Sequence, residues 1–322
     1  MGDSYIYKNQ KKLRWGYTTG TCAAAASLAA AVMLLQGRRM EQVSLTTPKG
    51  IRLDLEVEEM DPGENSVSCG VRKDAGDDPD VTDGLMVYSQ IRLPDADSGD
   101  AGCAGGDYVY EKDGLRLYLS GGVGVGRVTQ CGLSCEVGKA AINPVPRKMI
   151  FEQVAGVCRE SGFKGVLSIE IRVPGAFEVA HRTFNSRLGI RGGISILGTS
   201  GIVEPMSETA LLDTIRLELR QRIRKGEKNL LVTPGNYGEA FLKEHLSLPF
   251  EKNMKCSNFI GETIDMAVEK GVLGILFVGH IGKLIKVAGG IMNTHSRNAD
   301  ARAELMAAAA LRSGAGAEDA RR

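Results

Sequence analysis

The sequence RWGYTTGTCAAAA, residues 14–26, sets three hydroxyl side chains directly before an alanine-rich run that predicts a helix over about 21–36. Thr18, Thr19 and Thr21 are each of the type that caps a helix, and a capped helix start presents the positive end of the helix dipole. Capping alone would explain one threonine. Three threonines with two glycines and an aromatic residue also suit a site that attracts anions. The sequence leaves both interpretations open.

The rest of the first half predicts strands with few helices. Its apolar segments alternate or are β-branched and are separated by Pro, Gly and Asp: VSLTT, IRLDLEVEE, SVSCGVR, LMVYSQIRL and LRLYLS. A second helix is expected at about 146–160. We therefore predict an α+β domain around an antiparallel sheet over residues 1–150.

The sequence pattern differs in the second half, where apolar strands are followed by glycine-rich loops. Helical stretches come after several of these loops. The four segments are GVLSIEIRVPG, GISILGTSG, NLLVTPGNYG and GILFVGHIGK. This alternation predicts an α/β domain over 151–322, Rossmann-like and with a mostly parallel sheet. The tail SGAGAEDARR lacks apolar periodicity and should be frayed.

Composition narrows the class of partner. The chain has 322 residues with a formal net charge of +1, so no global field draws it to nucleic acid or to an anionic membrane. Its longest apolar stretches are short and rich in alanine, which argues against a bilayer span. Seven cysteines, an odd number, and a start without signal-peptide features indicate the reducing cytosol. We expect a cytoplasmic protein.

The four glycine-rich loops predict a ligand site, because ligands of open parallel sheets bind outside the carboxyl ends of the strands. On this view Gly175 and the turns at 198–201, 234–238 and 279–283 ring one crevice. The alternative is that each loop is only the tight turn that any strand-to-helix connection needs.

Two other segments have competing interpretations. GGVGVGRVT, residues 121–129, offers a run of backbone amides, but it matches neither GxGxxG nor the P-loop, so a flexible turn is as good an explanation as a phosphate clamp. KDAGDDPDVTDG, residues 73–84, has five aspartates. The segment can be a solvated loop, a magnesium site, or a source of carboxylates that stabilise a sulfonium charge. No metal-ligand spacing is complete, and no protein-bound metal is predicted.

His280 and His295 flank one segment rich in glycine, lysine and threonine. Either can serve as a base, as an axial ligand to a metal in the substrate, or as a capping group. Lys283 and Arg147 add local positive charge that suits a substrate with many carboxylates, since Arg can hold a carboxylate through two hydrogen bonds.

Ordered blocks over about residues 14–305 resemble the cobalt-precorrin-5B C1-methyltransferase family, CbiD, of anaerobic cobalamin synthesis. They are RWGYTTGTCAAAA, KDAGDDPDVTDG, GGVGVGRVT, AINPVPRKMI, GISILGTSGIVEPMS, VTPGNYGEAF, SNFIGE and GHIGKLIKVAGGIMNTHSRNADARAE. The resemblance implies methyl transfer from S-adenosylmethionine to C1 of a cobalt-bound tetrapyrrole, giving cobalt-precorrin-6A. The cobalt is then carried by the substrate.

The implied reaction turns the candidate residues into site hypotheses. Because a sulfonium methyl is already activated, the protein mainly aligns the reactants and excludes water. Tyr17, Tyr237 or Phe259 is a candidate to face the cationic sulfur. Catalysis is assigned to His280 or His295. Donor binding is assigned to Gly198, Thr199, Gly201, Pro234, Gly235, Asn236 and Gly238. Substrate binding is assigned to Thr18, Thr19, Thr21, Asn143, Arg147 and Lys283.

Two other classes of function stay open at this point. An ATP-dependent small-molecule kinase would hold phosphates with GGVGVGRVT and magnesium with the acidic loop. A non-catalytic corrinoid-binding protein would bind the pigment without consuming the donor. The sequence leaves a homo-oligomer open as well.

Overall fold

The computed structural model describes residues 5–8, 10–94, 106–183, 185, 188–245 and 252–321. The chain forms two compact units, Met1–Ser207 and Glu208–Arg322. The predicted domains 1–150 and 151–322 are therefore wrong at their boundary. The reason is that the strand after residue 150 completes the sheet of the first unit.

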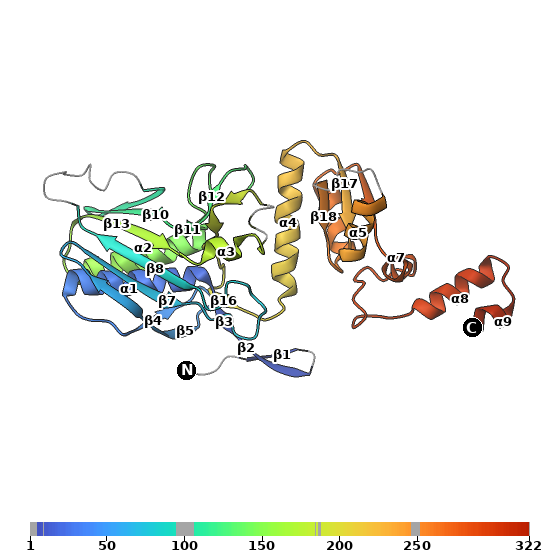
Figure 1. Ribbon diagram of the computed structural model, residues 1–322, viewed down its shortest axis with the longest axis horizontal. Coiled ribbons are helices and arrows are strands. Elements are labelled where there is room, and N and C mark those ends of the chain that lie inside the picture. The colour runs from blue at the N-terminus through green and yellow to red at the C-terminus, as the bar shows by residue number, and fades with distance from the viewer. Residues whose placement is uncertain are drawn as a thin grey trace. The chain divides into compact units, whose positions relative to one another are not determined.

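Unit 1 is built on a six-stranded sheet in the order β6-β7-β8-β13-β10-β9 (Figure 1). Its strands are β6 (Glu58–Pro62), β7 (Ser66–Arg72), β8 (Met86–Arg92), β9 (Tyr108–Lys112), β10 (Leu115–Gly121) and β13 (Gly165–Arg172). Neighbouring strands are antiparallel except β10 and β13, which are parallel. The expected antiparallel sheet is thus a mixed one, because the chain returns from β10 to β13 by a crossover that contains α2 (Pro144–Glu160).

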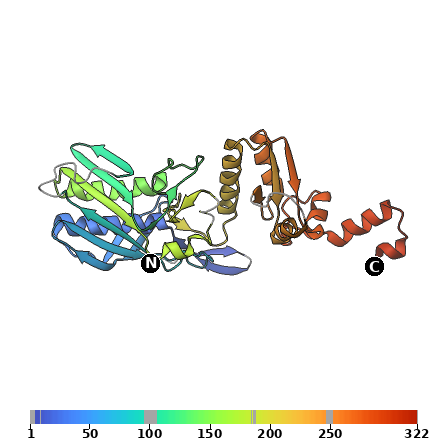
Figure 2. The same ribbon diagram turned by 45° about the horizontal axis from the view of Figure 1, so that its top comes forward.

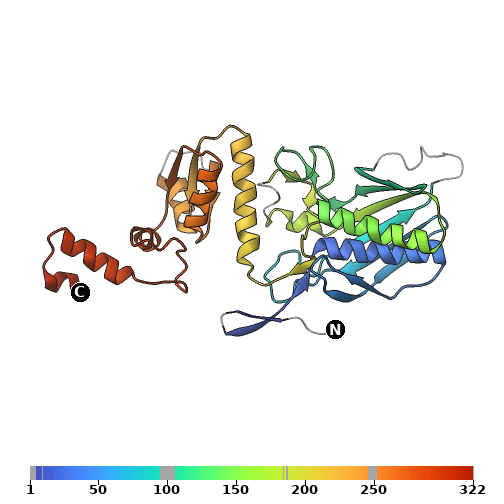
Figure 3. The same ribbon diagram turned by 180° about the vertical axis from the view of Figure 1, so that it is seen from behind.

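Two helices pack together on this sheet, as the views from front and back show (Figures 1 and 3). One is α2 and the other is α1 (Thr19–Gln36), which begins at its N-cap Thr18 and ends at Gly37 in the left-handed conformation. By length and apolar composition α1 could cross a membrane, but 72% of its apolar window is buried inside the protein. The small alanine side chains of α1 let α2 approach closely, as in a helix that packs in the core of a protein.

Short strand pairs complete unit 1. They are β1 (Tyr5–Lys8) with β2 (Lys11–Arg14), β3 (Gly16–Tyr17) with β16 (Ile202–Val203), β4 (Gln42–Thr46) with β5 (Arg52–Glu56), β11 (Gly124–Val125) with β15 (Gly193–Ile194), and β12 (Arg127–Val128) with β14 (Ile190–Arg191). A short helix, α3 (Ala176–Ala180), follows β13. The turned view shows the β9–β10 hairpin at one edge of the main sheet (Figure 2). The β3–β16 pair, with Tyr17 opposite Ile202, brings the start of α1 next to a segment that is distant in the sequence.

Unit 2 has a three-stranded, fully parallel sheet in the order β18-β17-β19. Its strands are β17 (Asn229–Thr233), β18 (Asn253–Lys255) and β19 (Gly274–Phe277). Its helices are α4 (Glu208–Arg224), α5 (Asn236–His245), α6 (Ile260–Glu269), α7 (Ile281–Ala288), α8 (Arg302–Arg312) and α9 (Ala317–Arg321). The tail predicted to be frayed contains α9, a short helix without buried residues, and fraying of the tail stays a prediction. The Rossmann-like classification stays a prediction.

Each unit has its own hydrophobic core. In unit 1 the core is formed by α1, α2 and the inward side chains of the main sheet, including Leu117 and Leu167. In unit 2 it lies between the parallel strands and the helices α4 and α6, and includes Leu219 and Leu230. Among the described residues, none belongs to both cores.

Candidate functional site

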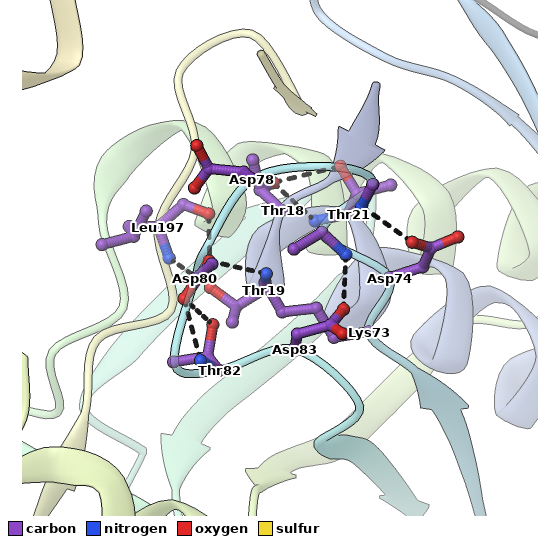
Figure 4. Close-up of polar contacts among 12 residues, drawn as sticks. Thr18, Thr19, Thr21, Lys73, Asp74, Asp78, Asp80, Thr82, Asp83 and Leu197 are labelled. Carbon is purple, nitrogen blue, oxygen red and sulfur yellow. Dashed lines mark hydrogen bonds and ion pairs between the residues drawn. The ribbon is translucent and has the colours of Figure 1, made fainter. Parts of the chain in front are cut away.

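The three threonines of the opening motif are buried and hydrogen-bonded within the chain (Figure 4). Oγ1 of Thr18 accepts a hydrogen bond of 3.3 Å from the backbone amide of Thr21. The Thr21 hydroxyl donates to the carbonyl of Gly201 at 2.7 Å. The Thr19 hydroxyl accepts from the amide of Leu197 at 3.0 Å. These contacts cap α1 and fasten a distant loop to it, so substrate binding by the threonines stays a prediction that their burial argues against.

Gly198, Thr199 and Gly201, assigned to the donor pocket, belong to unit 1 and lie at this helix start. A Cβ on Gly198 would lie 2.2 Å from Oγ1 of Thr18, and one on Gly201 would lie 2.8 Å from the Cβ of Thr47. Close approach between chain segments therefore requires both glycines. The expectation that this turn shares one sheet edge with the other donor residues is wrong, because those follow a strand of the unit 2 sheet.

The acidic loop is held in place by contacts of its own carboxylates. Asp74 accepts two hydrogen bonds, of 2.6 and 2.7 Å, from the guanidinium of Arg14. Asp83 accepts from the amide of Ala75 at 2.7 Å. The other pairs are Asp77 with the amide of Arg14, Asp78 with the amide of Met206, and Asp80 with Lys73. The loop is thus tied to other segments, and no group of three or more His, Cys, Asp or Glu among the described residues is placed to hold a metal ion.

Lys73 is a buried cation whose side chain is 2% exposed. Its Nζ lies 2.7 Å from Oδ2 of Asp80, and the other oxygen of that carboxylate accepts from the hydroxyl and the amide of Thr82. Burial by itself would raise the pKa of Asp80. The charge and hydrogen bond of Lys73, together with Thr82, outweigh burial and lower that pKa below its ordinary value. The Asp80 carboxylate is therefore ionised at neutral pH.

A cavity of about 640 Å³ lies beside Tyr17 and the acidic loop. It is lined by Tyr17, Gln42, Asp54, Leu55, Glu56, Glu58, Arg72, Lys73, Asp74, Asp83 and Gly84. Five of these side chains are carboxylic and two are basic. The volume falls within the roughly 300–1,000 Å³ that small-molecule sites occupy. The cavity thus has the size of a ligand site and an excess of negative charge.

Asn143 and Arg147 lie at the start of α2. Asn143 is the N-cap residue, although its side chain makes no capping hydrogen bond. The guanidinium carbon of Arg147 lies 4.0 Å from the ring centroid of Tyr108, and Nζ of Lys139 lies 5.5 Å from the same centroid. Nε of Arg147 is buried and has no hydrogen-bond partner among the described residues. Two cations around one ring form a basic spot suited to a carboxylate, so substrate binding here stays a prediction.

Two of the four predicted strand-end loops meet at the carboxyl edge of the unit 2 sheet. The Nζ of Lys283 donates to the carbonyl of Pro234 and, at 2.9 Å, to Oδ1 of Asn258. A Cβ on Gly235 would lie 3.3 Å from that Nζ. Burial lowers the pKa of Lys283. Lys283 therefore ties the turn after β17 to the segment before α6, and its predicted contact with the substrate has no support from this geometry.

The remaining donor residues of this edge have packing roles. A Cβ on Gly238 would lie 2.0 Å from the carbonyl oxygen of Val278, so only glycine fits there. Oδ1 of Asn236 accepts from Nζ of Lys255 at 3.4 Å. Gly175, the fourth predicted loop, belongs to unit 1. The expectation that all four loops ring one crevice at a single sheet is wrong for Gly175 and for the turn at 198–201.

The two candidate histidines make local backbone contacts. His280 is the N-cap of α7, and its Nδ1 accepts from the amide of Gly282 at 3.0 Å. Its ring centroid lies 5.6 Å from that of Tyr237. Nδ1 of His295 accepts from the amide of Arg297 at 3.1 Å. Of the roles left open by the sequence, capping is the one that the structure gives His280, and catalysis by either histidine stays a prediction.

Sequence reasoning passed over the carboxylates of the cavity at Asp54, Glu56 and Glu58. They alternate with Leu55 and Val57, a pattern that ordinarily marks the solvated face of a strand. The sequence also gave no signal that Lys286 is buried, with Nζ donating to the carbonyl of Ala299 at 2.9 Å. Alternation of polar and apolar residues shows that a side chain points away from the core, but it does not show which other segment that side chain contacts.

Comparison with known proteins identifies relatives over nearly the whole chain. A family model described as CbiD matches residues 6–205, which lie in unit 1. A protein of Ruminiclostridium cellulolyticum named cobalt-precorrin-5B C(1)-methyltransferase is 50% identical over 316 residues, covering 98% of this chain and 77% of that protein. A protein of the same name from Thermoanaerobacter sp. (strain X514) is 50% identical over 309 residues, covering 94% of this chain and 77% of the relative.

A solved structure is also similar. It is the crystal structure of a protein described as cobalamin biosynthesis protein (cbiD) from Archaeoglobus fulgidus, with 26% sequence identity and a TM-score of 0.46. The match covers 92% of this chain and 86% of the other.

Proposed function

This chain belongs to the CbiD family, and we infer from that membership that it is a cobalt-precorrin-5B C1-methyltransferase of cobalamin biosynthesis. The observation that carries the inference is the 50% identity to a protein of that name over 98% of the chain. It is thus an enzyme that forms a carbon–carbon bond between a methyl group and ring carbon C1. We place it in the cytoplasm, where such a biosynthetic step takes place.

S-adenosylmethionine is the proposed donor, and it supplies a methyl group on a positively charged sulfur. The bond from methyl to C1 forms as the bond from methyl to sulfur breaks, and the electron pair of the broken bond leaves the sulfur neutral. This displacement needs no protein nucleophile, so the residues of the chain hold, align and desolvate the two reactants. The acidic cavity of unit 1 fits a cationic donor by its charge and size.

The substrate carries its own cobalt and many carboxylates, and the chain offers it Arg147. This guanidinium is partly buried beside Tyr108 and has one buried nitrogen without a partner among the described residues. Arg is the side chain best suited to grip an acetate or propionate through two hydrogen bonds. We therefore keep Asn143 and Arg147, at the start of α2, as the proposed contact for the periphery of the macrocycle. His280 and His295 stay proposed bases.

The test is anaerobic incubation of the protein with cobalt-precorrin-5B and S-adenosylmethionine labelled in its methyl group, followed by mass analysis of the pigment. We expect the pigment to gain one labelled methyl at C1. The same assay on Arg147→Ala should give a raised KM for the pigment and an unchanged affinity for the donor.

Three results would contradict the proposal. Pigment binding without consumption of the donor would identify a corrinoid-binding protein. Binding of ATP with magnesium and none of the donor would identify a kinase. Methylation of the pigment at another carbon would overturn the assignment to C1.

A further inference from the structure

We propose that the cavity beside Tyr17 binds the positively charged end of the methyl donor, with Glu56, Asp54 and Tyr17 as its recognition groups. This inference rests on the function proposed above and places the donor in unit 1. It departs from the glycine-rich loops that the sequence favoured.

The cavity is built by segments that the fold holds firmly. Asp54 and Glu56 stand on β5, which pairs with β4 along its whole length. Tyr17 stands on β3, directly before α1, and its hydroxyl donates to the carbonyl of Arg72 at the end of β7, at 2.9 Å. Asp74 belongs to the acidic loop, which is fastened to Arg14. Strands and a tied loop thus define the volume of about 640 Å³.

The charges that line the cavity do not cancel. Arg72 forms hydrogen bonds of 3.1 and 2.8 Å with Glu58, and Lys73 is committed to Asp80. Both lining cations are therefore used within the protein. Glu56 and Asp83 have no ion pair among the described residues, and the pair of Asp54 with Arg52 is long, at 3.8 Å, and exposed. Negative charge is left over, which favours a cationic ligand.

Tyr17 adds an apolar, electron-rich surface that ordinary surface aspartates lack. Tyr17 is one of the residues that line the cavity, and the faces of aromatic rings attract cations. Burial raises the pKa of Tyr17, and the nearby Cys22 thiol and Asp74 carboxylate act in the same direction, so the phenol stays neutral. An aromatic ring beside unpaired carboxylates is a combination that recognises sulfonium and ammonium groups.

The same charges disfavour the other reactant. A tetrapyrrole with many carboxylates would be repelled by this cavity, whereas Arg147 and Lys139, the two cations around Tyr108, are not among the residues that line it. The anion-binding and cation-binding groups are thus different residues. After transfer the sulfur of S-adenosylhomocysteine is neutral, so the cavity should hold the product more weakly than the donor.

The experiment compares the binding of S-adenosylmethionine and S-adenosylhomocysteine to the full chain by calorimetric titration at low and high salt. The variants are Glu56→Gln, Asp54→Asn and the double variant. The control is Glu152→Gln, on the exposed surface of α2 in the same unit. We expect each single variant to weaken donor binding up to about fivefold and the double variant about tenfold, as for partly exposed ion pairs. Product binding should fall less than donor binding, because the product keeps its ammonium group but has a neutral sulfur. Donor binding to the control should be unchanged, and the preference for donor over product should shrink with salt.

Equal loss of donor and product affinity would overturn the inference, because the carboxylates would then not sense the charge on sulfur. Unchanged donor affinity in the double variant would also overturn it, if the variant keeps the wild-type melting temperature and the wild-type enzyme methylates the pigment. In that case the proposed function stands and only the location fails. A wild-type protein that neither binds the donor nor transfers its methyl group overturns both.

Discussion

Lys73 and Asp80 illustrate how a single ion pair fixes a loop. The ammonium group is buried almost completely, whereas the carboxylate stays 26% exposed. Removing the carboxylate would leave a buried positive charge without a partner. Removing the lysine would leave a carboxylate that can still reach water.

We therefore predict that Asp80→Asn costs more stability than Lys73→Met. Asp80→Asn should lower the free energy of unfolding by about 3 kcal/mol, and Lys73→Met by clearly less. Urea denaturation monitored by circular dichroism measures both, with the double variant to complete the cycle. Equal costs for the two single variants would contradict the assigned burial of the charges.

The same carboxylate predicts a pH dependence. The pKa of Asp80 is lower in the folded protein than its ordinary value of 3.8, so its contribution to stability is complete above that value. The contribution is lost as the pH falls below that value and through the lower folded-state pKa. The free energy of unfolding should fall more steeply over this range in the wild type than in Asp80→Asn. Parallel curves for the two proteins would refute the assignment.

At the scale of elements, the glycines of GGVGVGRVT are explained by close strand contact. Gly124 of β11 pairs with Gly193 of β15, and it has a φ of 78°. A Cβ on Gly124 would lie 1.8 Å from the carbonyl oxygen of Val173. The segment therefore needs glycine so that one backbone can cross another, which removes the motif's support for a phosphate clamp.

Gly124→Ala should be among the most harmful single changes in unit 1, costing about 4 kcal/mol or more, or preventing folding. Gly138→Ala is the matched control, since Gly138 also has a positive φ, of 88°. Among the described residues other than Gly138 and its two chain neighbours, no atom lies within 4 Å of the added Cβ. The control should cost only about 1–2 kcal/mol, the penalty for the left-handed conformation. Soluble expression and the midpoints of urea denaturation measure the stability of both variants. Similar losses of stability in the two variants would exclude the steric explanation.

Elements were also the scale at which the sequence was most informative. The alanine-rich helix and the strands VSLTT, SVSCGVR and LRLYLS were predictable because their apolar spacing is local. The candidate site was harder to predict from the sequence. The sequence is the same whether Thr18, Thr19 and Thr21 contact a ligand or a loop 180 residues away. Only the pairing of β3 with β16 shows that they contact the loop.

At the scale of the whole molecule, the predicted domain boundary failed for a topological reason. GVLSIEIRVPG reads as the first strand of a parallel α/β domain, and it is indeed parallel to a neighbour, but that neighbour is β10 of unit 1. Local periodicity identifies a strand with one buried face, without saying which sheet contains it. The sequence did not point to the cavity carboxylates Asp54, Glu56 and Glu58 for a similar reason, since the acidic loop that faces them lies elsewhere in the sequence.

Separate cores predict separate effects of core mutations. Leu167→Ala in unit 1 and Leu230→Ala in unit 2 remove the same atoms from buried sites, and each should cost about 2–5 kcal/mol. In hydrogen exchange followed by mass spectrometry, Leu167→Ala should speed exchange in β8, β10 and β13. Leu230→Ala should speed it in β17, β18 and β19. Faster exchange throughout both units in either variant would show that they unfold as one.

The place of β13 in the main sheet has a consequence for synthesis of the protein. This strand is made last of the six, yet it lies between β8 and β10. A nascent chain that ends before residue 165 therefore has its sheet in two parts, with unpaired backbone groups along β8 and β10. Such open edges invite pairing with other chains. Translation through α2 and β13 is thus the interval in which the growing polypeptide most needs a chaperone.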